Sequence, residues 1–141
     1  MAYWLLKTEA DAWSWDQQKK KGAKGEPWSG VRNFQAAKNM KAMKKGEQGF
    51  FYHTGEERRI VGIVEIIGEY RKDPTDETGR FGLVEVQAQK DMPKPVTLAD
   101  IKATPALSDM VLVKNSRLSI QPIAAPEWGI ICRLAGIATP P

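Results

Sequence analysis

One short segment, WSGVRNFQA, gathers side chains that could recognise a planar ligand: Trp28, Arg32, Asn33 and Gln35. The guanidinium of Arg32 matches the shape of a phosphate or of a base edge. The amides of Asn33 and Gln35 can each donate and accept hydrogen bonds toward a nucleobase. The indole of Trp28 offers a flat face on which a base can stack. Together these groups are typical of a pocket that accepts one base extruded from a nucleic acid.

A second segment, GFFYHT, carries Tyr52 and the single histidine of the chain, His53. An apolar strand does not need imidazole for its packing, so His53 is a further candidate for recognition, and Tyr52 adds another aromatic face. Because side chains alternate along a strand, Tyr52 and Thr54 lie on one face and His53 on the other. The two rings can therefore reach one pocket only if the strand bends at its end.

The residues of the first segment also have a purely structural interpretation. Trp28 could anchor a hydrophobic core, Arg32 could form a surface ion pair, and Asn33 could cap the helix that follows. Residue type and spacing alone do not decide between this interpretation and recognition, so both stay open.

Motifs for catalysis and for cofactors are scarce. One histidine and one cysteine, Cys132, cannot supply the three or four ligands of a zinc or transition-metal centre, so no metal is expected. The chain contains neither GxxxxGK(S/T) nor GxGxxG, the two common phosphate-binding loops. His53 with a serine could form a hydrolytic pair, but no nucleophile elbow or flanking carboxylate marks one. We therefore expect no cofactor and assign no catalytic residue.

Length and composition indicate one ordinary globular domain, spanning residues 1–141. No apolar run approaches the roughly 20 residues of a membrane span, so no membrane partner is expected. The N-terminal MAYWLLKTEA enters a strand-like pattern without the features of a secretory signal. The lone Cys132 fits a reducing compartment. We expect an intracellular protein, cytoplasmic or, in a eukaryote, nuclear.

The charge balance is modestly positive. Twenty-one Lys and Arg residues against 17 Asp and Glu give a net charge of +4, which permits a nucleic-acid partner without requiring one. The helix predicted over residues 34–45 has an apolar face, and four lysines fall off that face: Lys38, Lys41, Lys44 and Lys45. They are most simply its solvent side, although the same ammonium groups could contact a phosphate backbone.

Residue patterns predict a mixed α/β domain built on a curved sheet. Apolar runs separated by Gly, Asp and Pro turns predict strands over residues 3–7, 49–54, 59–70, 81–90, 110–113 and 116–121. Capping signals and apolar periodicity predict helices over residues 15–21, 34–45, 97–103 and 127–134. Gly62 and Gly68 inside the longest strand suggest bulges or bends, which curl a sheet.

Four separated motifs, together with PEW at 126–128, resemble the EVE domain family. They are YWLLKTE (3–9), WSGVRNFQA (28–36), GFFYHT (49–54) and NSRLSIQP (115–122), and they occur in the family's order. The resemblance implies a PUA-like fold, a curved sheet or pseudo-barrel with short flanking helices, related to the YTH domains that read methylated adenine in RNA. It also implies a reader of DNA or RNA that holds a flipped, methylated or hydroxymethylated base in a partly aromatic pocket.

The resemblance further implies where the pocket lies. It would form where the segment of Trp28, Arg32, Asn33 and Gln35 meets the strand of Tyr52 and His53 and the segment of Ser116 and Arg117. Strand alternation would put Ser116 and Arg117 on opposite sides, and the sequence leaves open which of them faces the ligand. Phe34 stands where the family commonly has Tyr, and Ala37 where Arg often follows.

Two other functions stay open. The first is a hydrolase, an amidohydrolase or nuclease, that acts on a modified nucleoside: the related ASCH domains share the PUA-like fold, and some use Lys, Thr and Glu, which this chain has as Lys7, Thr8 and Glu9. Neighbouring residues on a strand point to alternate sides, so these three cannot form a triad by themselves. The third function is that of an adaptor that uses the fold only to contact other proteins.

Overall fold

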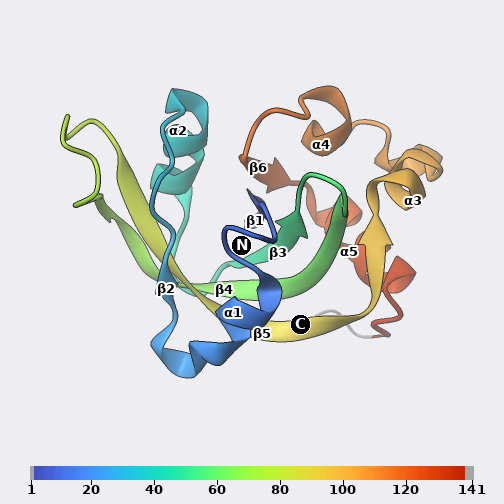
Figure 1. Cartoon of the computed structure of the whole chain (residues 1–141). Coiled ribbons are helices and arrows are strands. Elements are labelled where there is room, and N and C mark those ends of the chain that lie inside the picture. The colour runs from blue at the N-terminus through green and yellow to red at the C-terminus, as the bar shows by residue number, and fades with distance from the viewer. Residues whose placement is uncertain (1, 139–141) are drawn as a thin grey trace.

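A strongly curved sheet organises the structure, a computed structural model that describes residues 2–138. Within that range the sheet has six strands in the order β2-β5-β4-β3-β1-β6. Figure 1 shows β4 and β5 sweeping in a long arc below the shorter central strands. The strands are β1 (Tyr3–Thr8), β2 (Glu26–Pro27), β3 (Gln48–His53), β4 (Arg59–Lys72), β5 (Gly82–Thr97) and β6 (Ile120–Ile123). β1 pairs with β3 in parallel, and the other neighbours are antiparallel.

Short helices flank the sheet, and two of them cover its opposite faces. α2 stands on one face and α5 lies against the other (Figure 1). The helices are α1 (Trp15–Lys20), α2 (Phe34–Ala42), α3 (Leu98–Lys102), α4 (Val111–Lys114) and α5 (Ala125–Leu134), with 3₁₀ turns η1 (Gly22–Lys24) and η2 (Pro105–Leu107). The predicted mixed α/β class with a curved sheet and short flanking helices is therefore confirmed.

Strand alternation divides the core into two clusters, one on each face. Leu5 and Phe50 point to the face of α5, where the Phe50 ring stacks on Trp128 at 3.9 Å between centroids. Leu6 and Phe51 point to the opposite face, which α2 covers with Met40. The segment that follows β2 joins this second cluster, so the candidate site is built on the α2 face.

Glycines bend the long strand β4, as the sequence predicts. Its pairing with β5 shifts register between Ile60 and Gly62 and again on both sides of Gly68. At Gly62 a Cβ atom would lie 2.2 Å from the Trp15 ring, so only glycine lets α1 pack this closely on the sheet. The bend and the close approach together position α1 and the residues that precede it.

Local signals placed most elements, with two corrections near the C-terminus. The capping box of Ser14 and Gln17 starts α1, as predicted. Residues 110–113 are not a strand: the Lys114 amide donates to the Met110 carbonyl, and residues 111–114 form α4. A four-residue apolar run does not distinguish a strand from a helical turn. The strand predicted over residues 116–121 is present only from Ile120, since residues 116–119 precede the ladder in a turn.

Several further boundaries differ from the sequence prediction, and the ends of α2 and β5 differ most. α2 ends at Ala42 because Met43 is extended, with ψ 138°, and its side chain is buried in the core. β5 continues to Thr97 and passes through two prolines.

No helix in the described stretch combines the length and the apolar character that a bilayer crossing needs. Residues 2–138 also hold no group of three or more His, Cys, Asp and Glu side chains that could bind a metal ion.

Candidate functional site

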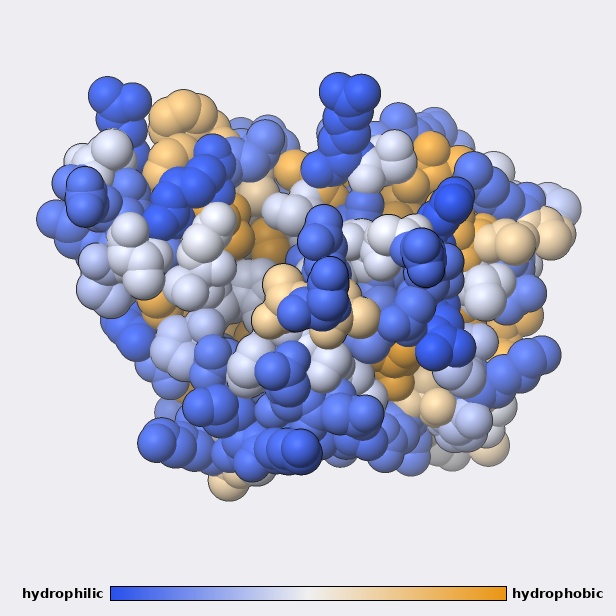
Figure 2. Space-filling model, in the orientation of Figure 1, coloured by the Kyte–Doolittle hydropathy of each residue, from blue (hydrophilic) through white to orange (hydrophobic). Residues whose placement is uncertain are grey.

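A cavity of about 410 Å³ opens on the α2 face of the sheet. It lies between the end of β1 and the extended segment that joins β2 to α2, and Figure 2 shows this side of the molecule hollowed beside α2. Its lining comes from Lys7 and Thr8 of β1, from Ala12 and Trp13, from residues 26–32, and from Ser119. Segments distant in sequence therefore build one recess.

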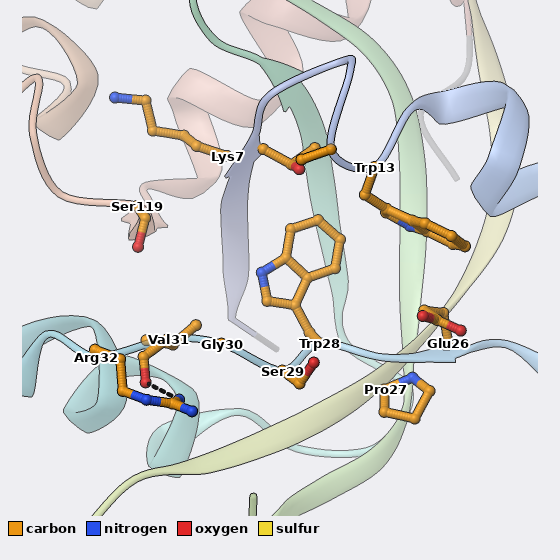
Figure 3. A pocket seen from close by; sticks show the side chains of 12 residues that line it. Lys7, Trp13, Glu26, Pro27, Trp28, Ser29, Gly30, Val31, Arg32 and Ser119 are labelled. Atoms are coloured by element: carbon orange, nitrogen blue, oxygen red, sulfur yellow. Dashed lines mark hydrogen bonds between the residues drawn. The ribbon is translucent and has the colours of Figure 1, made fainter. Parts of the chain in front are cut away.

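Trp28 is both a wall of the cavity and a part of the core. In Figure 3 its ring lies between Trp13 on one side and Lys7 and Ser119 on the other. The residue is only 8% exposed, and its ring meets Phe51 edge-on at 5.6 Å. Its amide donates to the Val84 carbonyl at 2.7 Å, which ties the segment to the sheet. The structural and the recognition interpretations of Trp28 thus apply to the same side chain.

Trp13 is a second aromatic wall that the sequence analysis missed. It is half-buried, and its indole Nε1 donates to Oε1 of Gln18 at 2.9 Å. Gln18 is itself fully buried and donates to the Val86 carbonyl at 3.2 Å, so the indole is held from behind. The only local signal was a Trp directly before the helix cap Ser14, and a hydrophobic residue at that position is ordinarily explained by packing on the first turn of the helix.

Arg32 lines the cavity and is anchored by a buried carboxylate. Asp73 is fully buried and accepts hydrogen bonds from Arg32 Nη1 at 3.2 Å and from the Gly30 amide at 3.0 Å. The Thr75 amide and hydroxyl donate to its other oxygen at 2.8 and 2.6 Å. Burial would raise the pKa of Asp73, but these hydrogen bonds lower it, to about 2. Arg32 therefore does form an ion pair, and this pair with Asp73 holds the wall of the cavity in place.

Polar groups line the rest of the recess. Lys7 donates to the Ser116 carbonyl, and burial lowers the pKa of its amine. Glu26 is held 3.5 Å from the ammonium of Lys21. The hydroxyl groups of Thr8, Ser29 and Ser119 complete the lining, and each can donate or accept. Ser29 and Ser119 were not among the predicted site residues, because serines in loops carry no distinguishing pattern.

Asn33 and Gln35 do not line the cavity. Asn33 Oδ1 accepts from the Ala36 amide at 2.9 Å, so the helix-cap interpretation is confirmed for this residue. Gln35 is exposed on α2, where its Nε2 lies 3.4 Å from Asn39 Oδ1. Both lie just beyond Arg32, outside the recess.

Tyr52 and His53 are separated by strand alternation, and neither lines the cavity. Tyr52 is 2% exposed and belongs to the cluster under α5. His53 is buried on the other face, where its Nε2 accepts from the Trp15 amide at 3.1 Å. Its Nδ1 therefore carries the proton and donates to Glu57 at 2.9 Å. The imidazole is used to attach α1 to the end of β3.

Ser116, Arg117 and the lysines lie on the surface around the site. Ser116 and Arg117 are exposed in the turn before β6, and the Ser116 carbonyl accepts from Lys7. Four further lysines are exposed on α2 or just after it: Lys38, Lys41, Lys44 and Lys45. Lys41 lies over the Tyr70 ring at 5.5 Å, and the last two sit in the turn that leads to β3.

Lys7, Thr8 and Glu9, at the end of β1 and directly after it, are distributed between two cavities. Lys7 and Thr8 line the recess of Trp28, whereas Glu9 lines a separate recess of about 470 Å³. That second recess is acidic, with Asp11, Glu56 and Glu57 in its lining. A shared catalytic group of all three side chains is therefore not assembled.

A curved mixed sheet with an aromatic and polar recess at the end of β1 defines a small domain of the PUA-like class. The chain belongs to the EVE domain family, whose model matches residues 2–134.

Known structures and sequences of this family resemble the chain over nearly its full length. A protein of Rhodopseudomonas palustris solved by NMR is 52% identical, with a TM-score of 0.94 over 99% of this chain and 96% of that one. Human thymocyte nuclear protein 1 (THYN1) is 30% identical over 94% of this chain and 73% of its own length. The crystal structure of human THYN1 in complex with DNA containing 5-methylcytosine has a TM-score of 0.91, with 29% identity and complete coverage of both chains.

The fold also extends to YTH domains. The YTH domain of Zygosaccharomyces rouxii MRB1, solved with N6-methyladenosine RNA, has a TM-score of 0.58 over 94% of this chain and 83% of that one. At 23% identity this likeness concerns the fold alone. The relation between the two domain types that the sequence motifs imply is confirmed at that level.

Proposed function

We propose that this chain is a nucleic-acid-binding module that accepts one methylated or hydroxymethylated base, flipped into the recess beside Trp28. The observation that carries the proposal is the recess itself, which has Trp13 and Trp28 in its lining and a volume of about 410 Å³. That volume is in the range of small-ligand sites. The likeness to human THYN1, solved with 5-methylcytosine DNA, supports a modified base as the ligand.

The two tryptophans and the polar groups have different roles in this proposal. Trp13 and Trp28 provide the stacking faces, each typically contributing about 1–3 kcal/mol for a stacked base. Hydroxyl groups of Thr8 and Ser119 face the base edge, where they can donate or accept. The carboxylate of Glu26 suits an exocyclic amine, such as that of cytosine or adenine.

Residues outside the recess complete the proposed interface. Asn33, Gln35, Ser116 and Arg117 contact the nucleic acid around the flipped base, while Arg32 holds the wall. Lys38, Lys41, Lys44 and Lys45 contact phosphates. Tyr52 and His53 support the site from within the fold. The module acts by binding, without catalysis, in agreement with the separation of Glu9 from Lys7 and Thr8.

The test is a comparison of oligonucleotides that differ in one base. Fluorescence anisotropy at fixed salt would measure affinities for strands and duplexes carrying 5-methylcytosine, 5-hydroxymethylcytosine, N6-methyladenine or no modification. We expect at least a tenfold preference for one modified base. Mass spectrometry after incubation should show that this oligonucleotide is chemically unchanged. Trp28→Phe should keep most of the preference, because it keeps an aromatic face.

Two results would contradict the proposal in different ways. Equal affinity for all modified and unmodified probes would exclude a modified-base reader. Conversion of the modified base over many turnovers would instead support the hydrolase alternative. Leu134→Ala serves as the matched control, because Leu134 is an exposed apolar residue of α5, on the opposite face of the sheet.

A further inference from the structure

A pair of packed aromatic rings, one of them exposed, lies beside the recess and has no role in the site described above. Phe34, the first residue of α2, is 68% exposed. Its ring packs on Phe81 at 4.9 Å between centroids and an interplanar angle of 36°. Phe81, by contrast, is only 8% exposed, so it forms a fixed base under the exposed ring. Single exposed apolar residues are ordinary, but a ring held on a second, buried ring has a defined orientation.

A chain of contacts connects this pair to the wall of the recess. The guanidinium of Arg32 lies over the Phe81 ring at 5.9 Å, and Arg32 also lines the cavity. Figure 3 shows Arg32 at the edge of the recess. Figure 1 shows the β4–β5 hairpin, which carries Phe81, beside the N-terminal end of α2. Figure 2 shows apolar colour over this end of α2. The exposed ring is therefore at the rim of the proposed base site.

The charges around Phe34 indicate the kind of partner that this rim fits. Lys38 lies one turn further along α2, and Arg80 directly precedes Phe81; both are exposed. Within residues 2–138, neither side chain forms an ion pair. An exposed aromatic ring that is accompanied by two such cations suits a nucleic acid, which offers base faces and phosphates, better than an apolar protein surface.

We propose that Phe34 stacks on the base next to the flipped base, in the position that the flipped base leaves. This inference rests on the proposed function, because it needs one base to be extruded into the recess. Extrusion removes a stacking partner from the neighbouring base, and apolar side chains of other nucleic-acid-binding proteins fill such gaps. Phe34 would supply the missing face, with Lys38 and Arg80 near the flanking phosphates.

The experiment combines three variants with two probe designs. The wild type, Phe34→Ala and Phe34→Trp are titrated against an oligonucleotide with the preferred modified base and natural neighbours, and against the same oligonucleotide with abasic neighbours. We expect Phe34→Ala to lose roughly tenfold in affinity for the natural probe. Phe34→Trp should keep the affinity. On the abasic probe the three proteins should bind equally, because no neighbouring base remains to stack.

The outcomes separate this inference from the function on which it rests. If the wild type does not prefer a modified base at all, the proposed function fails and this inference fails with it. If the preference is present but Phe34→Ala binds the natural probe as tightly as the wild type, only the role of Phe34 is refuted. An equal loss on both probes would also refute stacking on the neighbouring base. Thermal melting of Phe34→Ala checks that α2 remains folded.

Discussion

Asp73, in the hairpin between β4 and β5, holds Arg32, in the wall of the recess, by a hydrogen bond of 3.2 Å. The same carboxylate accepts from the Gly30 amide at 3.0 Å, so one buried group fixes the wall segment at two points. The recess therefore depends on a hairpin that contributes no residue to its lining. This relationship can be tested separately from the tryptophans.

Replacing Asp73 by Asn should loosen the wall of the recess, although the two side chains have nearly the same size. We expect a loss in free energy of unfolding of about 1–3 kcal/mol, because hydrogen bonds to a buried carboxylate are lost, together with weaker binding of the modified base. Asp76→Asn is the matched control: Asp76 lies in the same hairpin, but it accepts from Thr78 and from the Phe81 amide. Urea unfolding and anisotropy measure the two effects. Equal losses of affinity in the two variants would contradict the role of Asp73.

Acid should remove the contribution of Asp73 over a defined range of pH. Its pKa falls from an ordinary value of 3.8 to about 2 in the folded protein. A carboxyl group with a lowered folded pKa stabilises the fold above its unfolded pKa, and this stabilisation is lost as the pH falls through the folded pKa. The difference in unfolding free energy between the wild type and Asp73→Asn should therefore shrink between about pH 4 and pH 2. A constant difference in urea titrations across that range would contradict the assignment.

Replacing Trp13 should affect binding with little effect on stability, whereas replacing Trp28 should affect both. Trp13→Ala should weaken binding of the modified base about tenfold or more through the loss of a stacking face. Trp28→Ala should also cost about 3–5 kcal/mol of stability, because Trp28 is 8% exposed and packs on Phe51. Affinity and urea unfolding of both variants, with Trp13→Phe as control, measure this contrast. Unchanged binding by Trp13→Ala would remove Trp13 from the site.

His53 should matter for stability and not for chemistry. The Trp15 amide donates to its Nε2, and its Nδ1 donates to Glu57, so His53→Asn should lose about 1 kcal/mol in stability. Affinity at a temperature where both proteins are folded should change less than twofold. The probe oligonucleotide should be recovered chemically unchanged from both. Turnover by the wild type that this substitution abolishes would contradict the binding function.

The lysines of α2 should appear in the salt dependence of binding. If Lys38 and Lys41 each contact a phosphate, reversing their charge should flatten the slope of log affinity against log salt by about 0.7–0.9 per contact. Lys102→Glu is the control, because Lys102 is exposed on α3, which packs with the cluster on the opposite face. A slope unchanged by the reversal would assign the two lysines to the solvent side of the helix.

Local signals predicted the elements better than the contacts among them. Ser14 and Asn33 were identified as helix caps because a cap is satisfied within three residues along the chain. Residues 110–113 were predicted as a strand, because four apolar residues fit either periodicity and only the Lys114-to-Met110 hydrogen bond decides. The fold class followed from strand patterns together with the family motifs.

The site was less accessible to sequence reasoning, because its parts come from separate elements. Trp28 and Arg32 were identified from one crowded segment. Trp13 was not, since no local pattern tells which of the tryptophans faces a recess. One of the two partners of His53 is the Trp15 amide, 38 residues earlier in the chain, and sequence spacing does not show that pairing. Contacts between residues far apart in the sequence therefore determine which of the candidate residues line the recess, and short motifs do not show these contacts.

The parallel pairing of β1 with β3 has a consequence for how the chain folds. β3, β4 and β5 can assemble as a meander from neighbouring antiparallel strands, whereas β1 lies between β3 and the distant β6. Loop closure over such separations is slow, so we expect β1 and β6 to join the sheet after the meander has formed. Lys7, Thr8 and Ser119 lie on these strands or next to them, and the Trp28 amide is bound to β5 over a still longer stretch of chain than the one that separates β1 from β3. All the walls of the recess thus depend on contacts between distant parts of the chain, so the recess should form late in folding.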